Sequence, residues 1–204
     1  MELTAAFQVF EAGGIWSKPM YITDVEDAFG QLIVHYRPER KAVLSEETAF
    51  LVQTLLRTVV DRGTGAALRS TYNFRLPAAG KTGTTNDFTD AWFVGFTPHL
   101  VAGVWVGLDD PSNRLGRGLQ GARVALPIWA RFITAACDTM HYPDADFEMP
   151  ATVLAKNICV ETGKLATPGC PAVRLEYFNR KFPLPEMCPR HSGDLYPDQR
   201  PNLY

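Results

Sequence analysis

Lys81, Thr82 and Gly83 form a triplet whose side chains suit acyl transfer. Lys-Thr-Gly at the start of a strand is one of three short motifs in a known type of serine acyl-transfer site. The other two are Ser-x-x-Lys, which carries the nucleophile, and Ser-x-Asn. None of the five serines has Lys three positions later or Asn two positions later; they are Ser17, Ser45, Ser70, Ser112 and Ser192. We therefore expect the nucleophile of such a site to lie outside this chain.

A phosphate-binding P-loop is the alternative interpretation of Gly80-Lys81-Thr82, and the surrounding sequence disfavours it. A P-loop has a further Gly five residues before the glycine of Gly-Lys-[Ser/Thr], whereas position 75 is Arg. It also has a helix directly after the Lys, whereas residues 91–94 and 101–106 are rich in the β-branched and aromatic residues typical of strands.

Long stretches on both sides of the triplet carry a second, more specific pattern. The run from Pro77 reads P-A-A-G-K-T-G-T-T-N-D-F-T-D-A-W-F-V-G-F-T-P, and L-V-A-G-V-W-V-G-L-D-D follows His99. Further pieces flank it at 5–14, 43–52, 59–65, 125–132 and 161–166. Together these resemble the transpeptidase domain of class A penicillin-binding proteins, the bifunctional enzymes that polymerise and cross-link peptidoglycan. The resemblance covers nearly the whole chain.

The resemblance implies a role for each residue of the triplet and for the two threonines after it. Lys81 would place a positive charge beside the catalytic hydroxyls and the terminal carboxylate of the substrate. Thr82 and Thr84 would donate hydrogen bonds to that carboxylate, and Gly83 would let the substrate backbone lie along the strand. The Thr84 N–H would form half of the oxyanion hole, so Lys81 and Thr84 are the expected catalytic residues. Thr85 completes the expected substrate-binding set.

The implied substrates are peptidoglycan stem peptides that end in D-alanyl-D-alanine, with β-lactams as their mimics. An acyl-enzyme would form on a Ser with loss of the terminal D-alanine, and an amine of a second stem peptide would accept the acyl group. No cofactor is expected, and the upstream portion of the same protein is the expected partner. The alternative is a non-catalytic remnant that binds peptidoglycan or another partner. A hydrolytic carboxypeptidase or β-lactamase is disfavoured, because the tail with Cys170 and Cys188 resembles the class A synthases.

Composition narrows the class of protein further. A hydrophobic content of 46% indicates a packed core, and a net charge of −2 with a pI near 6.1 disfavours nucleic acid as a partner. No run approaches the roughly 18 apolar residues that a membrane span needs, and no signal peptide is evident. Because members of the family act outside the cytoplasmic membrane and are anchored upstream, we expect the extracytoplasmic face of that membrane.

The four cysteines are concentrated toward the end of the chain. The expected extracytoplasmic location favours a disulfide, with Cys170 to Cys188 as the preferred pair and Cys159 as the competitor. Free buried thiols are the alternative. No metal site is expected, because Cys-x-x-Cys spacing is absent, although the sequence from Cys188 to His191 comes near a ligand pair.

The predicted fold class is α+β, with an antiparallel sheet flanked by helices. It would be an incomplete penicillin-binding or serine β-lactamase-like fold in residues 1–137, followed by a loop-rich, possibly disulfide-linked extension in 138–204 that contains many prolines. Predicted strands cover 19–25, 31–36, 78–85, 91–96 and 100–108. Predicted helices cover 3–11, about 124–136 and the segment from an N-cap at Ser45 to Gly63-Thr64-Gly65. A small hairpin is predicted for 153–164.

Three other groups of residues are assigned no catalytic role. Tyr177-Phe178-Asn179 spells a variant of the second motif, but it follows Lys-Thr-Gly whereas the family order puts it before. Asp87 and Asp90 lie in a Thr-rich segment, which favours turn capping over a carboxylate pair. The four histidines are scattered along the chain.

Overall fold

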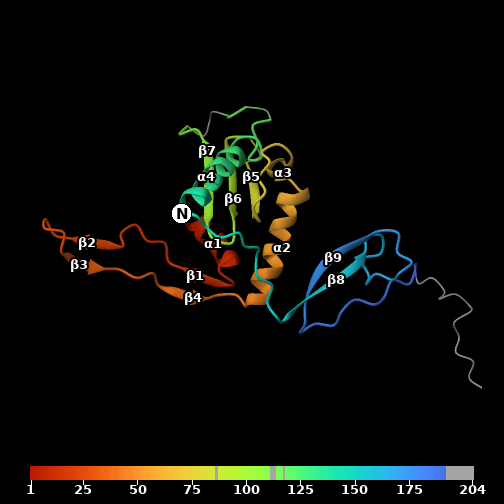
Figure 1. Cartoon of the computed structure of the whole chain (residues 1–204). Coiled ribbons are helices and arrows are strands. Elements are labelled where there is room, and N and C mark those ends of the chain that lie inside the picture. The colour runs from red at the N-terminus through yellow and green to blue at the C-terminus, as the bar shows by residue number, and fades with distance from the viewer. Residues whose placement is uncertain (86, 111–113, 117, 192–204) are drawn as a thin grey trace, which may run out of the picture. The chain divides into compact units, whose positions relative to one another are not determined.

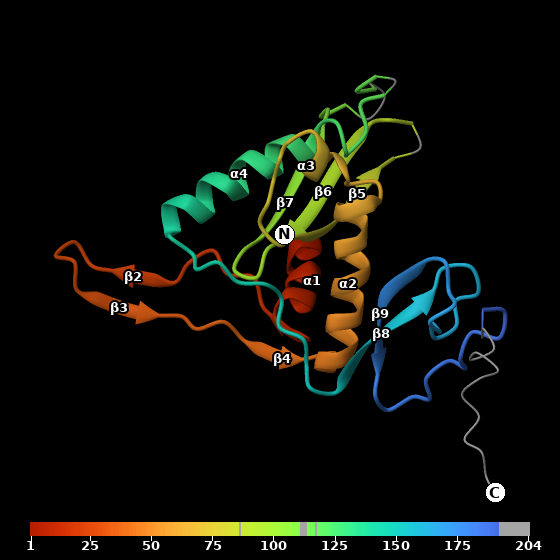
Figure 2. The same cartoon turned by 45° about the vertical axis from the view of Figure 1, so that its right-hand side comes forward.

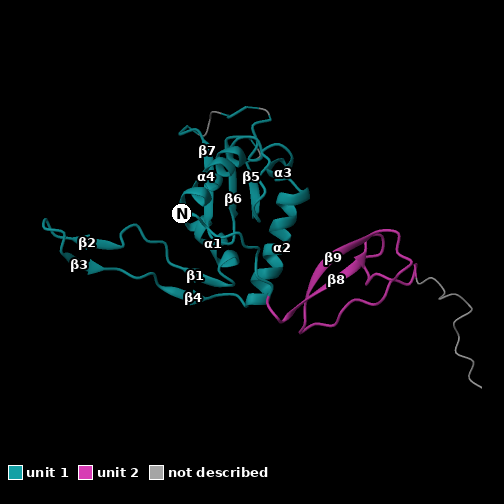
Figure 3. Cartoon of the chain, in the orientation of Figure 1, with its two compact units in different colours: residues 1–149 teal, residues 150–204 magenta. Residues whose placement is uncertain are grey.

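The computed structural model describes residues 1–85, 87–110, 114–116 and 118–191. The chain forms two compact units, Met1–Met149 and Pro150–Tyr204 (Figure 3). Ser112 and the tail from Ser192 onward lie outside the described residues. No helix in the described part is both long enough and apolar enough to cross a membrane.

The first unit is built on a three-stranded antiparallel sheet in the order β5-β6-β7 (Figure 1). Its strands are β5 (Ala79–Thr84), β6 (Asp90–Phe96) and β7 (Val101–Gly107). Lys81 pairs with Val94, and Phe93 pairs with Val104. The three strands, their order and their antiparallel direction are as the sequence predicts.

The helices that accompany the sheet in the described part of this unit are α1 (Glu2–Glu11), α2 (Glu46–Arg62), α3 (Ala67–Ser70) and α4 (Ala125–Met140). The predicted N-cap of α2 is confirmed, because the Ser45 hydroxyl accepts a hydrogen bond from the Thr48 N–H at 3.3 Å. The helix also ends at Gly63, as predicted. Helix α4 continues beyond its predicted end at about residue 136 and stops at His141, which adopts left-handed φ and ψ angles.

The helices cover opposite faces of the sheet. Trp129 of α4 packs edge-on against Phe93 of β6, with 5.1 Å between the ring centroids. Gly103 of β7 lies against α1, because a Cβ atom added to this glycine would contact the side chain of Thr4. Phe93 and Gly103 belong to opposite faces, because Phe93 pairs with Val104 and side chains alternate along a strand. Figure 2 shows α4 and α1 running past the strands.

Trp129 lies at the centre of the core between α4 and the sheet. It is completely buried, its ring lies 5.6 Å from that of Phe74, and its Nε1 donates to the carbonyl oxygens of Gly95 at 3.3 Å and Ala102 at 3.0 Å. The buried residues of this core are Val60, Leu68, Phe74, Ala78, Phe93, Ala125, Leu126, Trp129, Ala130, Ile133 and Cys137. One side chain therefore joins a helix to two strands by both packing and hydrogen bonds.

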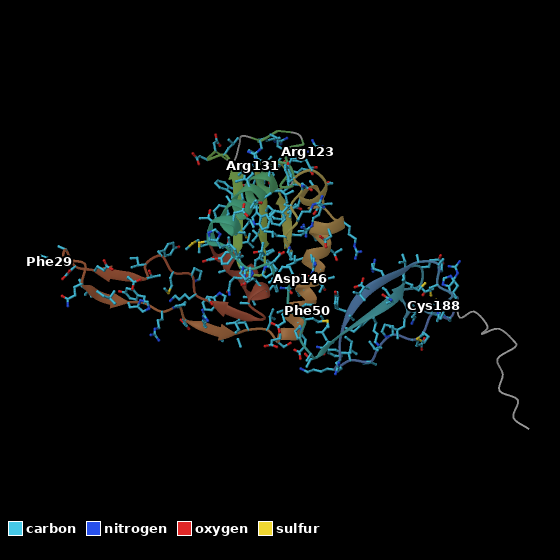
Figure 4. The ribbon with its side chains drawn as sticks, in the orientation of Figure 1. Phe29, Phe50, Arg123, Arg131, Asp146 and Cys188 are labelled. Carbon is cyan, nitrogen blue, oxygen red and sulfur yellow. The ribbon has the colours of Figure 1, made fainter. Side chains whose placement is uncertain are left out.

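The segment after α4 belongs to the first unit. Arg57 of α2 forms two hydrogen bonds with the carboxylate of Asp146, at 2.7 and 3.0 Å, and Phe147 packs edge-on against Phe96. Figure 4 shows Asp146 beside α2. The predicted division after residue 137 thus falls inside α4, and the unit extends to Met149 because these contacts hold the segment to the helix and sheet.

A long β-arm lies between α1 and α2. It consists of two antiparallel pairs, β1 (Ile15–Ser17) with β4 (Arg40–Ala42) and β2 (Asp24–Glu26) with β3 (Leu32–His35). The carboxylate of Asp27 closes the turn, since it accepts hydrogen bonds from the N–H groups of Phe29 and Gln31. The predicted strands 19–25 and 31–36 thus form an antiparallel pair with shorter bounds, Asp24–Glu26 and Leu32–His35.

In residues 150–191, the described part of the second unit, β8 (Val153–Cys159) pairs antiparallel with β9 (Val173–Asn179). The chain does turn back at the predicted place, because the N–H of Cys159 bonds to the carbonyl of Lys164 at 2.8 Å. The predicted hairpin of 153–164 is nevertheless only a small part of the structure. The main partner of β8 is β9, which the sequence did not reveal.

Replacing Trp129 tests the importance of the core between α4 and the sheet. We expect Trp129→Ala to lower the free energy of unfolding by about 3–5 kcal/mol, because it leaves a cavity and removes two hydrogen bonds. Phe132→Ala on the same helix is the matched control: its side chain is 54% exposed, so a loss within about 0.5 kcal/mol is expected. Urea unfolding followed by circular dichroism measures both. Equal losses would contradict this description of the core.

Candidate functional site

Strand β5 brings the predicted site residues together at the edge of the sheet. Within the described residues β5 pairs with β6 alone, so its other edge has no strand partner. Lys81 and Thr84 are exposed, while Thr82 and Gly83 are half-buried. An edge strand with unpaired backbone groups can accept an extended peptide by strand addition.

Gly80 fixes β5 closely against β6, a role that the sequence interpretation did not assign. A Cβ atom at this position would lie 2.8 Å from the Val94 carbonyl oxygen and 2.8 Å from Cζ of Phe93. Only glycine permits this approach without displacement of the neighbouring strand. The residue before Lys81 therefore sets the position of the lysine backbone.

The ammonium group of Lys81 lies along its own strand. Its Nζ donates a hydrogen bond to the carbonyl oxygen of Thr82 at 2.8 Å. An ammonium group has three N–H donors, so this contact leaves two for a ligand. The side chain is thus oriented at the strand edge while it keeps the capacity to bind an anion.

Thr82 and Thr84 lie on the same face of β5, because side chains alternate along a strand. The Thr82 hydroxyl is 2.8 Å from that of Thr64, in the loop that follows α2. The Thr84 hydroxyl accepts a hydrogen bond from the N–H of Gly121 at 3.1 Å. Because this bond uses only an oxygen lone pair, the O–H of Thr84 is still available as a donor.

Gly121 holds the loop before α4 against the site. It is buried, and a Cβ atom there would lie 2.6 Å from the Gly83 carbonyl oxygen. Gly121 is not among the residues that the sequence predicts for the site. The contact joins two glycines that are far apart in the sequence, so no local pattern indicated it.

The turn between β5 and β6 is organised by Thr85 and Asp90. The Thr85 hydroxyl accepts hydrogen bonds from the N–H groups of Thr89 and Asp90, both at 3.0 Å. The Asp90 carboxylate accepts from the Thr89 hydroxyl at 2.7 Å and from Nε1 of Trp105 at 2.8 Å, and these bonds lower the pKa of Asp90. The backbone N–H groups of this turn are thus capped by Thr85, whereas the Asp90 carboxylate, which was expected to cap the turn, bonds to two side chains. Asp87 forms a long ion pair with Arg114 at 3.4 Å.

The remaining sequence-predicted residues lie elsewhere. Tyr177-Phe178-Asn179 is part of β9 in the second unit, not of the unit that contains Lys81. All four cysteines are free thiols, so the expected disulfide between Cys170 and Cys188 is not formed. Cys137 lies in the core of the first unit. The other three belong to the second unit and are considered below.

Two sequence matches decide the family. Residues 1–129 match the penicillin binding protein transpeptidase domain, and residues 149–191 match the C-terminal domain of penicillin-binding protein 1A. The chain belongs to the penicillin-binding protein 1A family. It corresponds to the carboxyl-terminal portion of the transpeptidase domain followed by that C-terminal domain.

Individual relatives agree with this assignment. Penicillin-binding protein 1A of Aquifex aeolicus is 41% identical over 177 residues, which cover 87% of this chain and 24% of the relative. The crystal structure of penicillin-binding protein 1A from Haemophilus influenzae matches with a TM-score of 0.81 and 27% identity, over 92% of this chain and 32% of that one. The chain thus spans about a quarter of the length of the relatives it matches.

A further solved structure shares the fold. The PonA1 protein of Mycobacterium tuberculosis, in complex with penicillin V, matches with a TM-score of 0.56 and 23% identity, over 72% of this chain and 39% of that one. The predicted α+β fold class, a partial penicillin-binding transpeptidase fold, is confirmed.

Thr84→Val tests the contact that joins the Gly121 loop to β5. The substitution removes the acceptor of the buried Gly121 N–H, and we expect amide exchange at Gly121 to become at least about tenfold faster, equivalent to about 1.4 kcal/mol. Thr84→Ser retains the hydroxyl and should exchange at the original rate. Hydrogen exchange followed by NMR measures both; unchanged exchange in the valine variant would exclude this bond as a constraint on the loop.

Proposed function

We propose that this chain supplies the Lys-Thr-Gly wall of a D,D-transpeptidase active site, which cross-links peptidoglycan stem peptides through a serine acyl-enzyme. The observation that supports it best is the position of Lys81 to Thr84 on an edge strand that glycine contacts hold against the rest of the sheet. In keeping with its family, the protein would act at the extracytoplasmic face of the cytoplasmic membrane.

Substrate binding would use the unpaired edge of β5. A peptide ending in D-alanyl-D-alanine would lie along the strand and form backbone hydrogen bonds with it. Its terminal carboxylate would then meet the Lys81 ammonium and the hydroxyl donors of Thr82 and Thr84. A carboxylate accepts up to about four hydrogen bonds, so these groups can bind it together.

The chemical step needs a serine from outside this sequence. Its oxygen would attack the carbonyl carbon of the penultimate D-alanine, while the Thr84 N–H stabilises the oxyanion. The peptide C–N bond breaks, and the terminal D-alanine leaves as a protonated amine. An amine of a second stem peptide then attacks the ester and releases the serine. In a β-lactam the broken C–N bond belongs to a ring, so the leaving amine stays attached and the acyl-enzyme persists.

One observation favours a second candidate function. The 204 residues contain no Ser-x-x-Lys motif, so the chain by itself has no family nucleophile. A non-catalytic protein that binds stem peptides on β5 would need the same strand edge and no serine.

A chimera separates the two functions. The segment of Aquifex aeolicus penicillin-binding protein 1A that matches this chain would be replaced by residues 1–191, and the chimera would be treated with fluorescent penicillin. We expect covalent labelling that falls by about 100-fold in Lys81→Ala, the order of magnitude lost with one preorganised electrostatic contact. The isolated chain should not be labelled.

Lys41→Ala is the matched control, because Lys41 is an exposed strand lysine of the same unit. Its labelling should equal that of the unmodified chimera. A correctly folded chimera without labelling would favour the binding protein. Full labelling of the Lys81 variant would exclude the role given to Lys81.

A further inference from the structure

The described part of the second unit, residues 150–191, has a small apolar core. Only residues 150–191 of it are described, and among these the buried apolar side chains are Val153, Ile158, Cys159 and Cys188. Domains of fewer than about 70 residues often rely on a disulfide or a metal ion for stability. Two of the four buried residues are cysteines, so the stabilising element should involve them.

Three cysteines and one histidine converge in this unit. One ligand atom from each of Cys159, Cys170, Cys188 and His191 lies within 4.8 Å of the other three. The imidazole Nδ1 of His191 is 3.4 Å from Sγ of Cys159 and 3.3 Å from Sγ of Cys188. In tetrahedral Zn²⁺ coordination, with bonds of about 2.3 Å to sulfur and about 2.1 Å to nitrogen, such a pair is about 3.6 Å apart. The two nitrogen–sulfur distances are therefore close to those of a zinc coordination shell, and the remaining ligand atoms lie within 4.8 Å.

The backbone brings these ligands together from separate segments. Cys159 ends β8 and is followed by a turn at Gly163, whose φ is +67°. Leu165 then bridges to both Ile158 and Met187, and its carbonyl accepts a hydrogen bond from the N–H of Cys188 at 2.8 Å. The two buried cysteines are thus held on adjacent backbone segments that face one site.

Groups around the cluster are arranged as in metal sites. Nε2 of His191, the nitrogen that faces away from the sulfurs, is 3.4 Å from the carboxylate of Glu161. A carboxylate in this position fixes the ring orientation of a metal-bound histidine. The Thr162 hydroxyl and the Thr167 N–H each donate to a cysteine sulfur, Sγ of Cys188 and Sγ of Cys170, both at 3.3 Å. Such donors stabilise thiolates, which are the form that binds zinc.

We propose that the second unit binds one structural Zn²⁺ ion through four protein ligands, namely Cys159, Cys170, Cys188 and His191. On binding, the three thiols release their protons to solvent, and zinc keeps its oxidation state. All four tetrahedral positions are filled by protein, which is typical of structural rather than catalytic zinc. The match to the C-terminal domain spans residues 149–191 and so includes every ligand, ending at His191.

This arrangement accounts for more of the cluster than the disulfide expected from the sequence. A bond between Cys170 and Cys188 would use two sulfurs and leave the buried Cys159 and the imidazole of His191 without a function. Zinc uses all four groups at one centre. No metal site was predicted from the sequence, because Cys-x-x-Cys spacing is absent. Of the four proposed ligands, only Cys188 and His191 lie close together in the sequence.

The test must allow a disulfide to form if one is favoured. The 204-residue chain would be fused to a signal peptide, exported to a bacterial periplasm, where disulfides form, and purified without reductant. We expect about one zinc per chain by mass spectrometry, and four reactive thiols after denaturation with a chelator. Metal-free protein with only two reactive thiols would overturn the proposal in favour of a disulfide.

Two variants and a matched control localise the metal. Zinc content should fall to background in Cys170→Ser and in His191→Ala, and should stay at one in Cys137→Ala, which removes the cysteine of the other unit. Retention of full zinc content by both ligand variants would overturn the proposal.

Cobalt substitution gives a second test that needs no variant. In the unmodified chain, replacement of zinc by Co²⁺ should produce the visible absorption of tetrahedral cobalt with thiolate ligands. An octahedral cobalt spectrum would contradict the site.

Discussion

The close packing of β5 against β6 is the constraint on which the candidate active site depends. Gly80 lies so near Val94 and Phe93 that no side chain fits at this position. Strand β5 is therefore held closely against β6. Phe93 connects this contact to Trp129 of α4. The position of Lys81 thus depends on the same core that stabilises the first unit.

Two threonine contacts extend that constraint to the loops around the strand. Thr82 reaches Thr64 after α2, and Thr84 receives the N–H of Gly121 before α4. Each loop is attached to a helix that packs on the sheet. The site is therefore a strand edge with adjacent loops fixed to it, an arrangement that would suit the proposed binding of an extended peptide in one register.

The sequence predicted best where local signals were strong. The N-cap at Ser45, the terminating Gly63 and the apolar composition of the strands gave α2 and the β5-β6-β7 sheet nearly to the residue. The Lys-Thr-Gly residues were found by motif, and the structure places them on one strand edge. These features depend on residues close together in the chain.

Features that join distant segments escaped prediction. The segment that connects β8 to β9 has no hairpin signature, so the pairing of these strands was not predicted. The packing of Gly121 on Gly83 joins residues that are far apart in the sequence. The cysteine and histidine cluster also comes from three segments, so its ligand spacing matches no short motif. In each case the information lies in the fold and not in a local pattern.

A crystal structure of the chimera acylated by a penicillin would show whether β5 binds the carboxylate of the substrate or of its mimic. We expect the carboxylate of the bound drug to lie within about 3.2 Å of a donor on Lys81, Thr82 or Thr84, with the drug along the edge of β5. A carboxylate bound away from this strand would contradict this expectation.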